Sequence, residues 1–390
     1  MHLARKPVIV SNRAAAHLRT GHLWVFSTDV VNGSDAPSGE IVRVVDVQHR
    51  PLGYALYSHR SRIALRWIGS TEEPIDRDFW RHRLVAALDH RRRVVTNTDA
   101  YRLVFAESDL LPSLIIDRYG DHLSLQTLTP GMEALKSLWV ELLVDLIGPQ
   151  AIIERNDVRV RQLEGLELQT GVLYGTPRSR QEVTMNGIRF EVDLLEGQKT
   201  GLFLDQRENY EVAKQYARGR ALDCFCYCGG FALHLANRCD GVVAIDSSAD
   251  ALAEAKRNTN LNDLTNIEFL QANVFDVLRE LVKKKERFNT IVLDPPAFAK
   301  SREAVEGAIR GYKEINLRAL RLLKPSGILI TCSCSYHLNE EMFLGVLASA
   351  AADAHRQVQI LEKRMQARDH PVLLSMPETY YLKCIVLQVL

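Results

Sequence analysis

Three short apolar runs in the second half of the chain each end in a polar loop, and this pattern limits the fold more than any other feature. They occupy residues 221–231 (ALDCFCYCGGF), 293–296 (LDPP) and 329–335 (LITCSCS). Strands of a parallel sheet are buried on both faces, so they appear as short continuous apolar runs. Because ligands bind beyond the carboxyl ends of such strands, we expect the three polar loops to line one active-site crevice.

From about residue 186 the predicted strands alternate with helices, as in a doubly wound α/β domain. The predicted strands cover residues 221–226, 241–245, 267–271, 290–293 and 327–332, and the helices start near Phe231 and cover 249–258. We therefore predict a Rossmann-like domain with a mostly parallel sheet over residues 186–390.

The first half of the chain divides into two smaller predicted domains. Residues 1–70 form a small β-rich unit, with strands over 41–47, 52–57 and 62–68. Residues 71–185 form a central α+β domain, with helices over 74–95 and 132–147 and strands over 101–105, 113–117, 122–126 and 151–155. Neither domain contains paired carboxylates or metal-ligand spacing, so we predict no metal site.

Positive charge is concentrated at the start of the chain. Residues 1–102 hold 16 Arg and Lys against 10 Asp and Glu, a net charge of +6, although the whole chain has a net charge of only +1. Phosphate neutralisation supplies much of the affinity of proteins for nucleic acids, so this region is a candidate RNA contact. The candidate residues are Arg5, Lys6, Arg13, His17, Arg19 and Arg60, the aromatic residues Trp24, Tyr54 and Tyr57, and the helix residues Arg77, Arg81, Arg83, Arg91, Arg92 and Arg93. The alternative is a solvated basic surface over aromatic core residues.

The bulk composition is that of an ordinary globular protein. No apolar run approaches the roughly 20 residues needed to span a membrane, and the first residues lack the apolar core of a signal peptide. Seven cysteines are an odd number, and three of them alternate along one predicted strand, so we expect no disulfide framework. We therefore expect a cytoplasmic protein.

Two of the polar loops favour a nucleoside cofactor. The loop over residues 227–230 lacks the G-x-G-x-x-G spacing of dinucleotide sites, while Asp246 ends the next strand, where it can accept hydrogen bonds from ribose hydroxyls. This favours S-adenosylmethionine over NAD, although a plain turn and a helix cap would look the same. Two prolines after Asp294 fix a rigid turn that directs this carboxylate toward the crevice, the alternative being a helix N-cap.

The cysteines differ in their expected roles. Cys224 and Cys226 share one face of a predicted strand, where buried cysteine behaves as a small apolar residue. Cys239 and Cys384 have no special sequence context. Cys332 and Cys334 lie at a strand end opposite the Asp-Pro-Pro loop, where a thiolate can attack C6 of a pyrimidine and activate C5 for methylation.

Together these motifs resemble the class I S-adenosylmethionine-dependent methyltransferases, in particular the RlmI/YccW type of 23S rRNA cytosine-C5 methyltransferases. The resemblance extends over nearly the whole chain. Residues 1–70 resemble a PUA RNA-binding domain, and residues 106–112 (AESDLLP) and 116–121 (IDRYGD) match segments of the family's central domain. Residues 197–207 (GQKTGLFLDQR) resemble its most specific signature, and residues 331–335 (TCSCS) resemble its nucleophile motif.

The resemblance implies roles for particular residues. Cys334 is the implied nucleophile, with Cys332 ranked second, and Asp294 holds the base. The implied cofactor residues are Thr200, Phe203, Asp205, Gln206, Arg207, Asp223, Tyr227, Gly229, Asp246, Ser247, Asn273 and Asp294. Asn273 replaces an Asp that is frequent in the family, and Ala297 and Phe298 leave the Asp-Pro-Pro loop without a cysteine, so a nucleophile must come from the Ser-Cys-Ser loop.

The resemblance therefore implies a methyltransferase that forms 5-methylcytosine in large-subunit ribosomal RNA, bound through the basic N-terminal region. Two alternatives remain open. One is a guanine N-methyltransferase on rRNA, which needs no cysteine. The other is an RNA-binding or assembly factor without catalysis. The sequence leaves a homodimer open and does not identify the base that removes the C5 proton.

Overall fold

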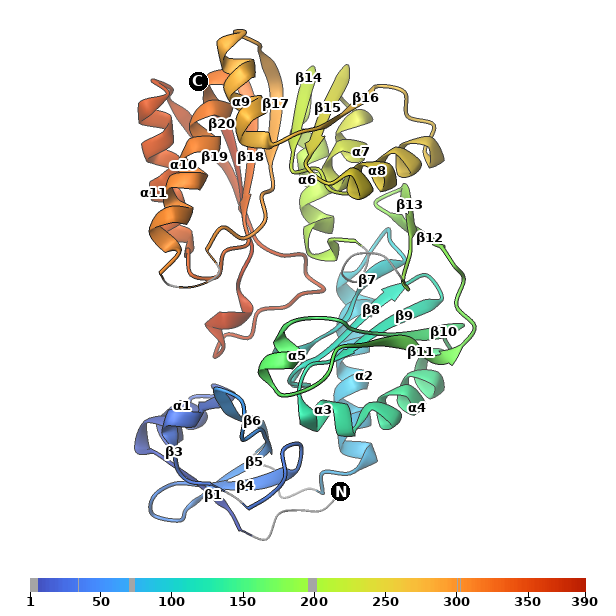
Figure 1. Ribbon diagram of the computed structural model, residues 1–390, viewed down its shortest axis with the longest axis vertical. Helices are drawn as coiled ribbons and strands as arrows, with labels where there is room; N and C mark the ends of the chain where they lie inside the picture. Colours follow the sequence, from blue (N-terminus) through green and yellow to red (C-terminus); the bar gives the residue numbers. More distant parts are fainter. Residues whose placement is uncertain (1–5, 34, 70–73, 196–201, 300, 302) are drawn as a thin grey trace. The chain divides into compact units, whose positions relative to one another are not determined.

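The computed structural model describes residues 6–33, 35–69, 74–195, 202–299, 301 and 303–390, and its elements are shown in Figure 1. The chain divides into two compact units. The first comprises the described residues of Met1–Val183, Val192–Gly201 and Arg368–Thr379, and the second those of Thr184–Glu191, Leu202–Ala367 and Tyr380–Leu390. None of the described helices is both long enough and apolar enough to cross a membrane.

A six-stranded sheet begins the first unit. In spatial order its strands are β2 (Trp24–Phe26), β6 (Ile63–Gly69), β5 (Pro51–Tyr57), β4 (Ile41–Val45), β1 (Val8–Val10) and β3 (Val30–Asn32). Three of these strands, β4, β5 and β6, confirm the strands predicted over 41–68. Helix α1 (Asn12–Arg19) was not predicted. Its signal is local, because the Ser11 hydroxyl accepts a hydrogen bond from the Ala14 amide at 3.2 Å as an N-cap.

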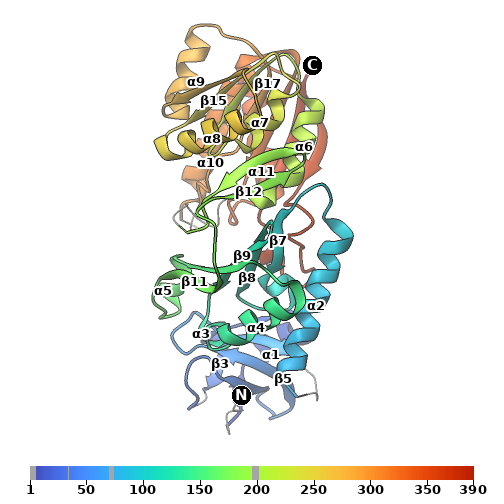
Figure 2. The same ribbon diagram turned by 90° about the vertical axis from the view of Figure 1, so that its right-hand side faces the viewer.

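A five-stranded sheet follows in the order β11 (Gln169–Gly175), β10 (Ala151–Asn156), β9 (His122–Thr127), β8 (Leu114–Tyr119), β7 (Ala100–Phe105). Helices α2 (Arg77–Val94), α3 (Pro130–Ala134) and α4 (Lys136–Ile147) pack on it, and Figure 2 shows α2 beside α4. The rings of Trp80 and Trp139 meet edge to face, with centroids 5.5 Å apart, where these two helices touch. Ile41, Leu56 and Ile68 of the first sheet belong to the same apolar cluster, so the two sheets share a core.

The arginines of helix α2, all of them candidates for an RNA contact, do not share one exposed face. Arg91 is 1% exposed, and its guanidinium binds the Asp109 carboxylate and the backbone carbonyls of Arg102 and Asp369. The buried apolar stripe of the helix is formed by Trp80, Leu84, Ala87 and Leu88. The hydropathy pattern failed here because a buried arginine with enough partners occupies a core position of a helix as an apolar residue does.

The second unit is a seven-stranded, doubly wound sheet, which confirms the predicted fold class. Its order is β16 (Ile267–Gln271), β15 (Gly241–Asp246), β14 (Arg220–Cys224), β17 (Phe288–Leu293), β18 (Leu323–Ser333), β20 (Lys383–Val389), β19 (Val358–Arg364). The first five strands are parallel, whereas β20 is antiparallel to both β18 and β19. The sequence analysis did not predict β19 or β20.

Helices cover both faces of this sheet (Figures 1 and 2). One face carries α6 (Arg207–Tyr216), α7 (Gly230–Ala236) and α8 (Ala249–Leu261), and the other carries α9 (Val274–Lys283), α10 (Val305–Leu322) and α11 (Glu340–Asp353). The hairpin of β12 (Gln181–Met185) and β13 (Ile188–Val192) turns at Asn186 and Gly187, which both have positive φ as a two-residue hairpin turn requires.

The chain leaves the second unit once between β19 and β20. Its segment Arg368–Thr379 belongs by its contacts to the first unit, although it lies within the range 186–390. There the Met376 sulfur accepts a hydrogen bond from the Leu23 amide at 3.2 Å, and the Ser375 hydroxyl donates to the Gly21 carbonyl at 2.8 Å. The Asp369 carboxylate accepts from the Arg102 amide at 2.9 Å. Side-chain and backbone hydrogen bonds thus fix this segment on the first unit.

Candidate active site

The carboxyl ends of four parallel strands bring the three predicted loops together. Cys224, at the end of β14, pairs with Ile245 of β15 and Leu293 of β17, and Leu293 pairs with Thr331 of β18. The loops that begin after these residues therefore lie at one edge of the sheet, as expected for the ligand site of an open parallel sheet.

The loop between β14 and α7 is a tight backbone turn. The strand ends at Cys224, two residues earlier than predicted, because Phe225, Tyr227 and Gly229 all have positive φ, at 66°, 50° and 88°. Cys226 therefore lies in the loop and not on a strand face, although it is buried as expected. Gly230 is required by packing, since a Cβ at this position would lie 2.5 Å from the ring of Tyr210.

Asp246 organises this loop from the end of β15. One carboxylate oxygen accepts a hydrogen bond from the Tyr227 amide at 2.9 Å, and the other accepts from the Ser248 amide at 2.9 Å. Ser247 is exposed beside it. Asn273 is also exposed, and its side chain accepts from the Phe275 amide as the N-cap of α9. These contacts place Asp246 in the site wall and give Asn273 a capping role that the sequence analysis did not predict.

Asp223 is fully buried below the loop, and neither of its carboxylate oxygens has a hydrogen-bond partner among the described residues. Burial raises the pKa of Asp223 well above its ordinary value, and the nearby Asp294 and Asp246 carboxylates raise it further. The backbone amide of Ala232, which does not meet hydrogen-bond geometry with either oxygen, opposes this rise only partly. A buried acceptor of this kind is a ready position for a cation or a hydrogen-bond donor.

Asp294 is held by a residue of the predicted signature. The side-chain amide of Gln206 donates to the Asp294 carboxylate at 2.9 Å, and Asn209 donates to Gln206 at 2.7 Å. Asp294 is half-buried at the end of β17, which is consistent with a carboxylate that faces a ligand and not with the alternative of a helix N-cap.

The other signature residues divide into two groups. The ring of Phe203 packs against Tyr227, with centroids 5.0 Å apart, and so lies beside the β14–α7 loop. Asp205 accepts a hydrogen bond from the Tyr381 hydroxyl at 2.7 Å. Arg207 is 2% exposed at the start of α6, where its carbonyl accepts from Asn186, so it is placed in the supporting structure. Thr200 lies outside the described residues.

The Ser-Cys-Ser loop follows β18. Cys334 is partly exposed, and its sulfur lies 3.9 Å from the carbonyl oxygen of Pro295, so it borders the Asp-Pro-Pro loop as predicted. Cys332 is fully buried and lies opposite Cys384 in the antiparallel pair of β18 and β20. Burial raises the pKa of the Cys332 thiol well above its ordinary value. Cys384, for which the sequence offered no context, is thus part of the wall behind the loop.

The sequence analysis did not predict two residues that contact the Ser-Cys-Ser loop, Tyr312 and Lys383. Tyr312 of α10 shares a hydrogen bond of 3.0 Å with the Ser335 hydroxyl, which also accepts from the Ala299 amide at 3.1 Å. Lys383, at the start of β20, donates to the Ser335 carbonyl at 2.8 Å. Both side chains come from elements distant in sequence. The only local signal for Lys383 was a lysine at the start of an otherwise apolar run, residues 384–387 (CIVL).

The basic residues predicted to meet RNA are only partly available. Carboxylates pair with six of them. Asp29 lies 2.8 Å from Arg13, Asp46 lies 2.7 Å from Arg19, and Asp35 lies 3.1 Å from Lys6. On helix α2, Arg77, Arg91 and Arg92 also pair with carboxylates. Tyr57 is buried, so the prediction that it stacks on bases is wrong, and the Trp24 indole donates to Glu107. His17 and Arg60 are exposed, and Arg5 lies outside the described residues.

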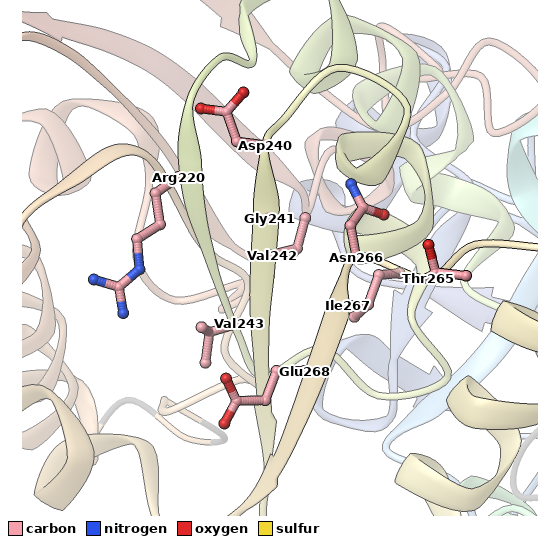
Figure 3. A pocket seen from close by; sticks show the side chains of 9 residues that line it. All are labelled: Arg220, Asp240, Gly241, Val242, Val243, Thr265, Asn266, Ile267 and Glu268. Atoms are coloured by element: carbon pink, nitrogen blue, oxygen red, sulfur yellow. The ribbon is translucent and has the colours of Figure 1, made fainter.

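A hollow of about 430 Å³ lies at the opposite ends of the same strands (Figure 3). It is lined by the first residues of β14, β15 and β16 and their neighbours, among them Arg220, Gly241 and Ile267. None of the predicted site residues lines it. It is therefore separate from the candidate active site.

Comparison with known proteins defines the class. A family model described as S-adenosylmethionine-dependent methyltransferase matches residues 161–372, and a model described as PUA-like domain matches residues 8–69. With the seven-stranded sheet and its glycine loop, these matches make the protein an S-adenosylmethionine-dependent methyltransferase that carries a PUA-like domain.

Curated relatives define the family within this class. A relative from Tolumonas auensis is 44% identical over 94% of this chain and 95% of its own length, and one from Aeromonas hydrophila is 41% identical over 97% and 98%. Both are named "Ribosomal RNA large subunit methyltransferase I". The chain belongs to this family, which confirms the predicted resemblance.

Solved structures support the fold. A methyltransferase solved in complex with SAH has a TM-score of 0.86, and an S-adenosylmethionine-dependent methyltransferase from Streptococcus mutans has a TM-score of 0.84. Each is 20% identical and is matched over 100% of both chains. At this identity the likeness shows the fold alone.

Proposed function

We propose that this protein methylates C5 of a cytosine in large-subunit ribosomal RNA, with Cys334 as the nucleophile. The observation that supports this best is the position of Cys334. It is the one partly exposed thiol among the seven cysteines, all of which the structure describes, and its sulfur lies beside the Asp-Pro-Pro loop. The name shared by the curated relatives supports the RNA substrate.

The chemistry follows from the residues at the site. The Cys334 thiolate adds to C6 of a cytosine that has left its base stack, which makes C5 nucleophilic. Asp294, oriented by Gln206, accepts a hydrogen bond from the exocyclic amine and fixes the base edge. After C5 has gained the methyl group, loss of the C5 proton restores the double bond and expels sulfur as thiolate.

The cofactor residues also fit a nucleoside sulfonium. The two unpartnered oxygens of Asp223 suit an ammonium group, and the tight turn at Gly229 leaves room for close approach of a ligand to the backbone. We assign Asp246 and Ser247 to the ribose side and Phe203, Tyr227 and Asn273 to the adenine side. Asp205, Gln206 and Arg207 support this wall. S-adenosylmethionine, when bound, supplies an electrophilic methyl group.

The first part of the chain supplies RNA affinity in this proposal. We assign residues 1–70 to RNA binding, 71–185 to a central domain and 186–390 to methyl transfer. Six arginines of the first two parts are exposed and have no carboxylate within ion-pair distance among the described residues: Arg43, Arg60, Arg62, Arg81, Arg93 and Arg159. None of the seven cysteines, all of which the structure describes, forms a disulfide, which favours a reducing compartment such as the cytoplasm.

Trapping of the covalent adduct tests the nucleophile. With RNA that contains 5-fluorocytidine, the fluorine cannot leave as a proton, so the sulfur stays bonded to C6. We expect a denaturation-resistant complex with the unchanged protein and with Cys332→Ala, and none with Cys334→Ala. Trapping by Cys334→Ala would remove the covalent step that we assign to this residue.

Nucleoside analysis separates the proposed reaction from its alternatives. Ribosomal RNA from cells that lack the protein should lose one 5-methylcytidine, and purified protein with S-adenosylmethionine should restore it. Appearance of a methylguanosine would establish the guanine alternative. No product, together with no heat of S-adenosylmethionine binding in calorimetry, would establish a non-catalytic RNA-binding protein.

A further inference from the structure

Lys383 is a buried cation that forms no ion pair with the residues that the structure describes. Its residue is 2% exposed, and its ammonium donates to the backbone carbonyls of Ser335 at 2.8 Å and Tyr381 at 2.9 Å. Lys383 forms no salt bridge within the described part of the chain, and Glu340, the carboxylate that acts on it electrostatically, pairs with Lys363 instead. Removing an ammonium group from water is unfavourable unless its charge has a use or a partner.

The carbonyl that Lys383 binds belongs to the residue directly after Cys334. The same residue, Ser335, is held through its hydroxyl by the Ala299 amide and the Tyr312 hydroxyl. Three elements therefore fix the backbone on the carboxyl side of Cys334. The lysine is the only charged group among these three contacts.

Two of the described residues interact electrostatically with Lys383, and one of them is Cys334. Burial lowers the pKa of Lys383 to about 8, while the electrostatic effects of Cys334 and Glu340 oppose this shift. Glu340, at the start of α11, already pairs with Lys363 at 3.0 Å and accepts from the Tyr380 hydroxyl at 2.9 Å.

Apart from Asp294, whose carboxylate acts on Cys332 behind the loop, the other titratable groups nearby include two tyrosines and a buried thiol. Tyr312 faces the loop from α10, and its pKa is raised by burial, as is that of Tyr380. Behind the loop, burial also raises the pKa of Cys332. The charge of Lys383 is therefore not cancelled by these tyrosines or by Cys332.

We propose that Lys383 is a positioning residue for the nucleophile: its ammonium stabilises the thiolate form of Cys334, and its hydrogen bond to Ser335 fixes the loop. This inference rests on the proposed role of Cys334. In the thiol form the sulfur can donate to the Pro295 carbonyl, 3.9 Å away, but a thiolate has no hydrogen to donate and would face that oxygen with like charge. A nearby cation compensates for this repulsion, as cations do at other reactive cysteines.

Alkylation of Cys334 by iodoacetamide tests this without RNA or cofactor. The other six cysteines are buried, so mild alkylation of the folded full chain modifies Cys334, and mass spectrometry of its peptide gives the rate. The rate should rise with pH as the thiolate forms. We expect Lys383→Met to lower the rate at pH 7.5 about tenfold and to move the midpoint of the pH profile upward.

Two further variants complete the test. Lys383→Arg keeps the charge, so it should keep most of the rate. Lys324→Met removes an exposed lysine from the same sheet, at the far end of β18, and should leave the profile unchanged. Lys383→Met replaces an ion without a carboxylate partner by an apolar side chain of similar length, a change that buried sites frequently tolerate.

The inference is overturned if folded Lys383→Met has the pH profile of the unchanged protein. It is overturned equally if, in folded Lys383→Arg, the midpoint of the alkylation profile moves to higher pH. This second criterion can be applied even if the methionine variant does not fold. The proposed function fails separately, through absence of the 5-fluorocytidine adduct. A shifted alkylation profile without that adduct would keep the role of Lys383 and remove only the role of Cys334 in the reaction.

Discussion

At the scale of the single residue, the buried carboxyl group of Asp223 lowers the stability of the fold. Its carboxyl group is fully buried, without a hydrogen-bond partner among the described residues, and next to Asp294. A protein fold gains nothing from such a group, because the charged form is poorly solvated and the neutral form leaves its hydrogen-bonding capacity unused. Residues with these features concentrate at functional sites.

This residue leads to a prediction on stability against pH. In the unfolded chain Asp223 ionises near 3.8, but in the folded protein burial and Asp294 raise its pKa, so it keeps its proton to higher pH. The folded state therefore loses stability as pH rises above about 4 toward the folded-state pKa. Asp223→Asn cannot ionise, so we expect it to be more stable at pH 8 by about 1–3 kcal/mol, with a smaller gain at pH 5.

Urea unfolding without cofactor measures this difference. Asp240→Asn is the matched control, because Asp240 is exposed at the other end of the sheet, and its effect should stay within about 0.5 kcal/mol at both pH values. The Asp223→Asn variant should also bind S-adenosylmethionine more weakly in calorimetry. A stability difference that does not change with pH would contradict the assignment of a raised pKa to Asp223.

At the scale of the element, helix α2 contains a buried arginine that could not be predicted from the sequence. Arg91, Arg92 and Arg93 are adjacent in the chain, yet only Arg91 is buried, with partners from three other segments. Its side chain is the polar centre of an otherwise apolar helix face. Removing it leaves the Asp109 carboxylate buried without its cation.

We therefore predict that Arg91→Met destabilises the protein strongly. Breaking a buried ion pair by removal of one partner costs about 3–5 kcal/mol. Arg93→Met changes an exposed arginine on the same helix and should cost less than about 0.5 kcal/mol. Thermal and urea unfolding of the two variants test this. Equal effects of the two substitutions would mean that Arg91 contributes no more than a surface residue.

The elements that could be predicted from the sequence are those whose signal is local. Strands β14, β17 and β18 were predicted because burial on both faces produces continuous apolar runs, and the helix over 249–258 was predicted from its periodicity. Arg91 and Lys383 were missed because the partners that make their burial favourable are distant in sequence. The pairing of β19 with β20 was missed for the same reason, since the segment Arg368–Thr379 separates the two strands.

The candidate site follows the same division. Asp246, Asp294 and Cys334 were predicted because each follows a buried strand, and the carboxyl ends of parallel strands share one edge. The hydrogen bonds that orient them, such as that from Gln206 to Asp294, depend on the packing of other elements. Sequence reasoning could therefore name the candidate site residues but not the residues that position them.

At the scale of the whole molecule, the nearly balanced net charge of +1 conceals how charge is distributed. A count of basic residues overestimates the number of side chains available to RNA phosphates, because Lys6, Arg13 and Arg19 already pair with carboxylates. Each paired cation must lose its partner's attraction before it gains that of a phosphate. The exposed arginines without a carboxylate nearby have no such competition.

This predicts that two sets of substitutions with equal loss of charge differ in RNA binding. Replacing Arg43, Arg60 and Arg62 with Gln should reduce the slope of log affinity against log salt concentration by about two, since each lost phosphate contact removes about 0.7 from single strands and about 0.9 from duplex DNA. Replacing Lys6, Arg13 and Arg19 with Gln should reduce it by less than one.

Fluorescence anisotropy of the full chain with a ribosomal RNA fragment, from 50 to 300 mM KCl, measures both slopes, and thermal unfolding checks that each triple variant is folded. Non-specific attraction to the net charge would weaken both variants alike, because both lose three positive charges. Equal slopes would therefore show that RNA binding does not depend on whether the basic side chains are already paired with carboxylates. A larger effect of the paired set would place the RNA on the α1 side of the first sheet, where Arg13 and Arg19 lie.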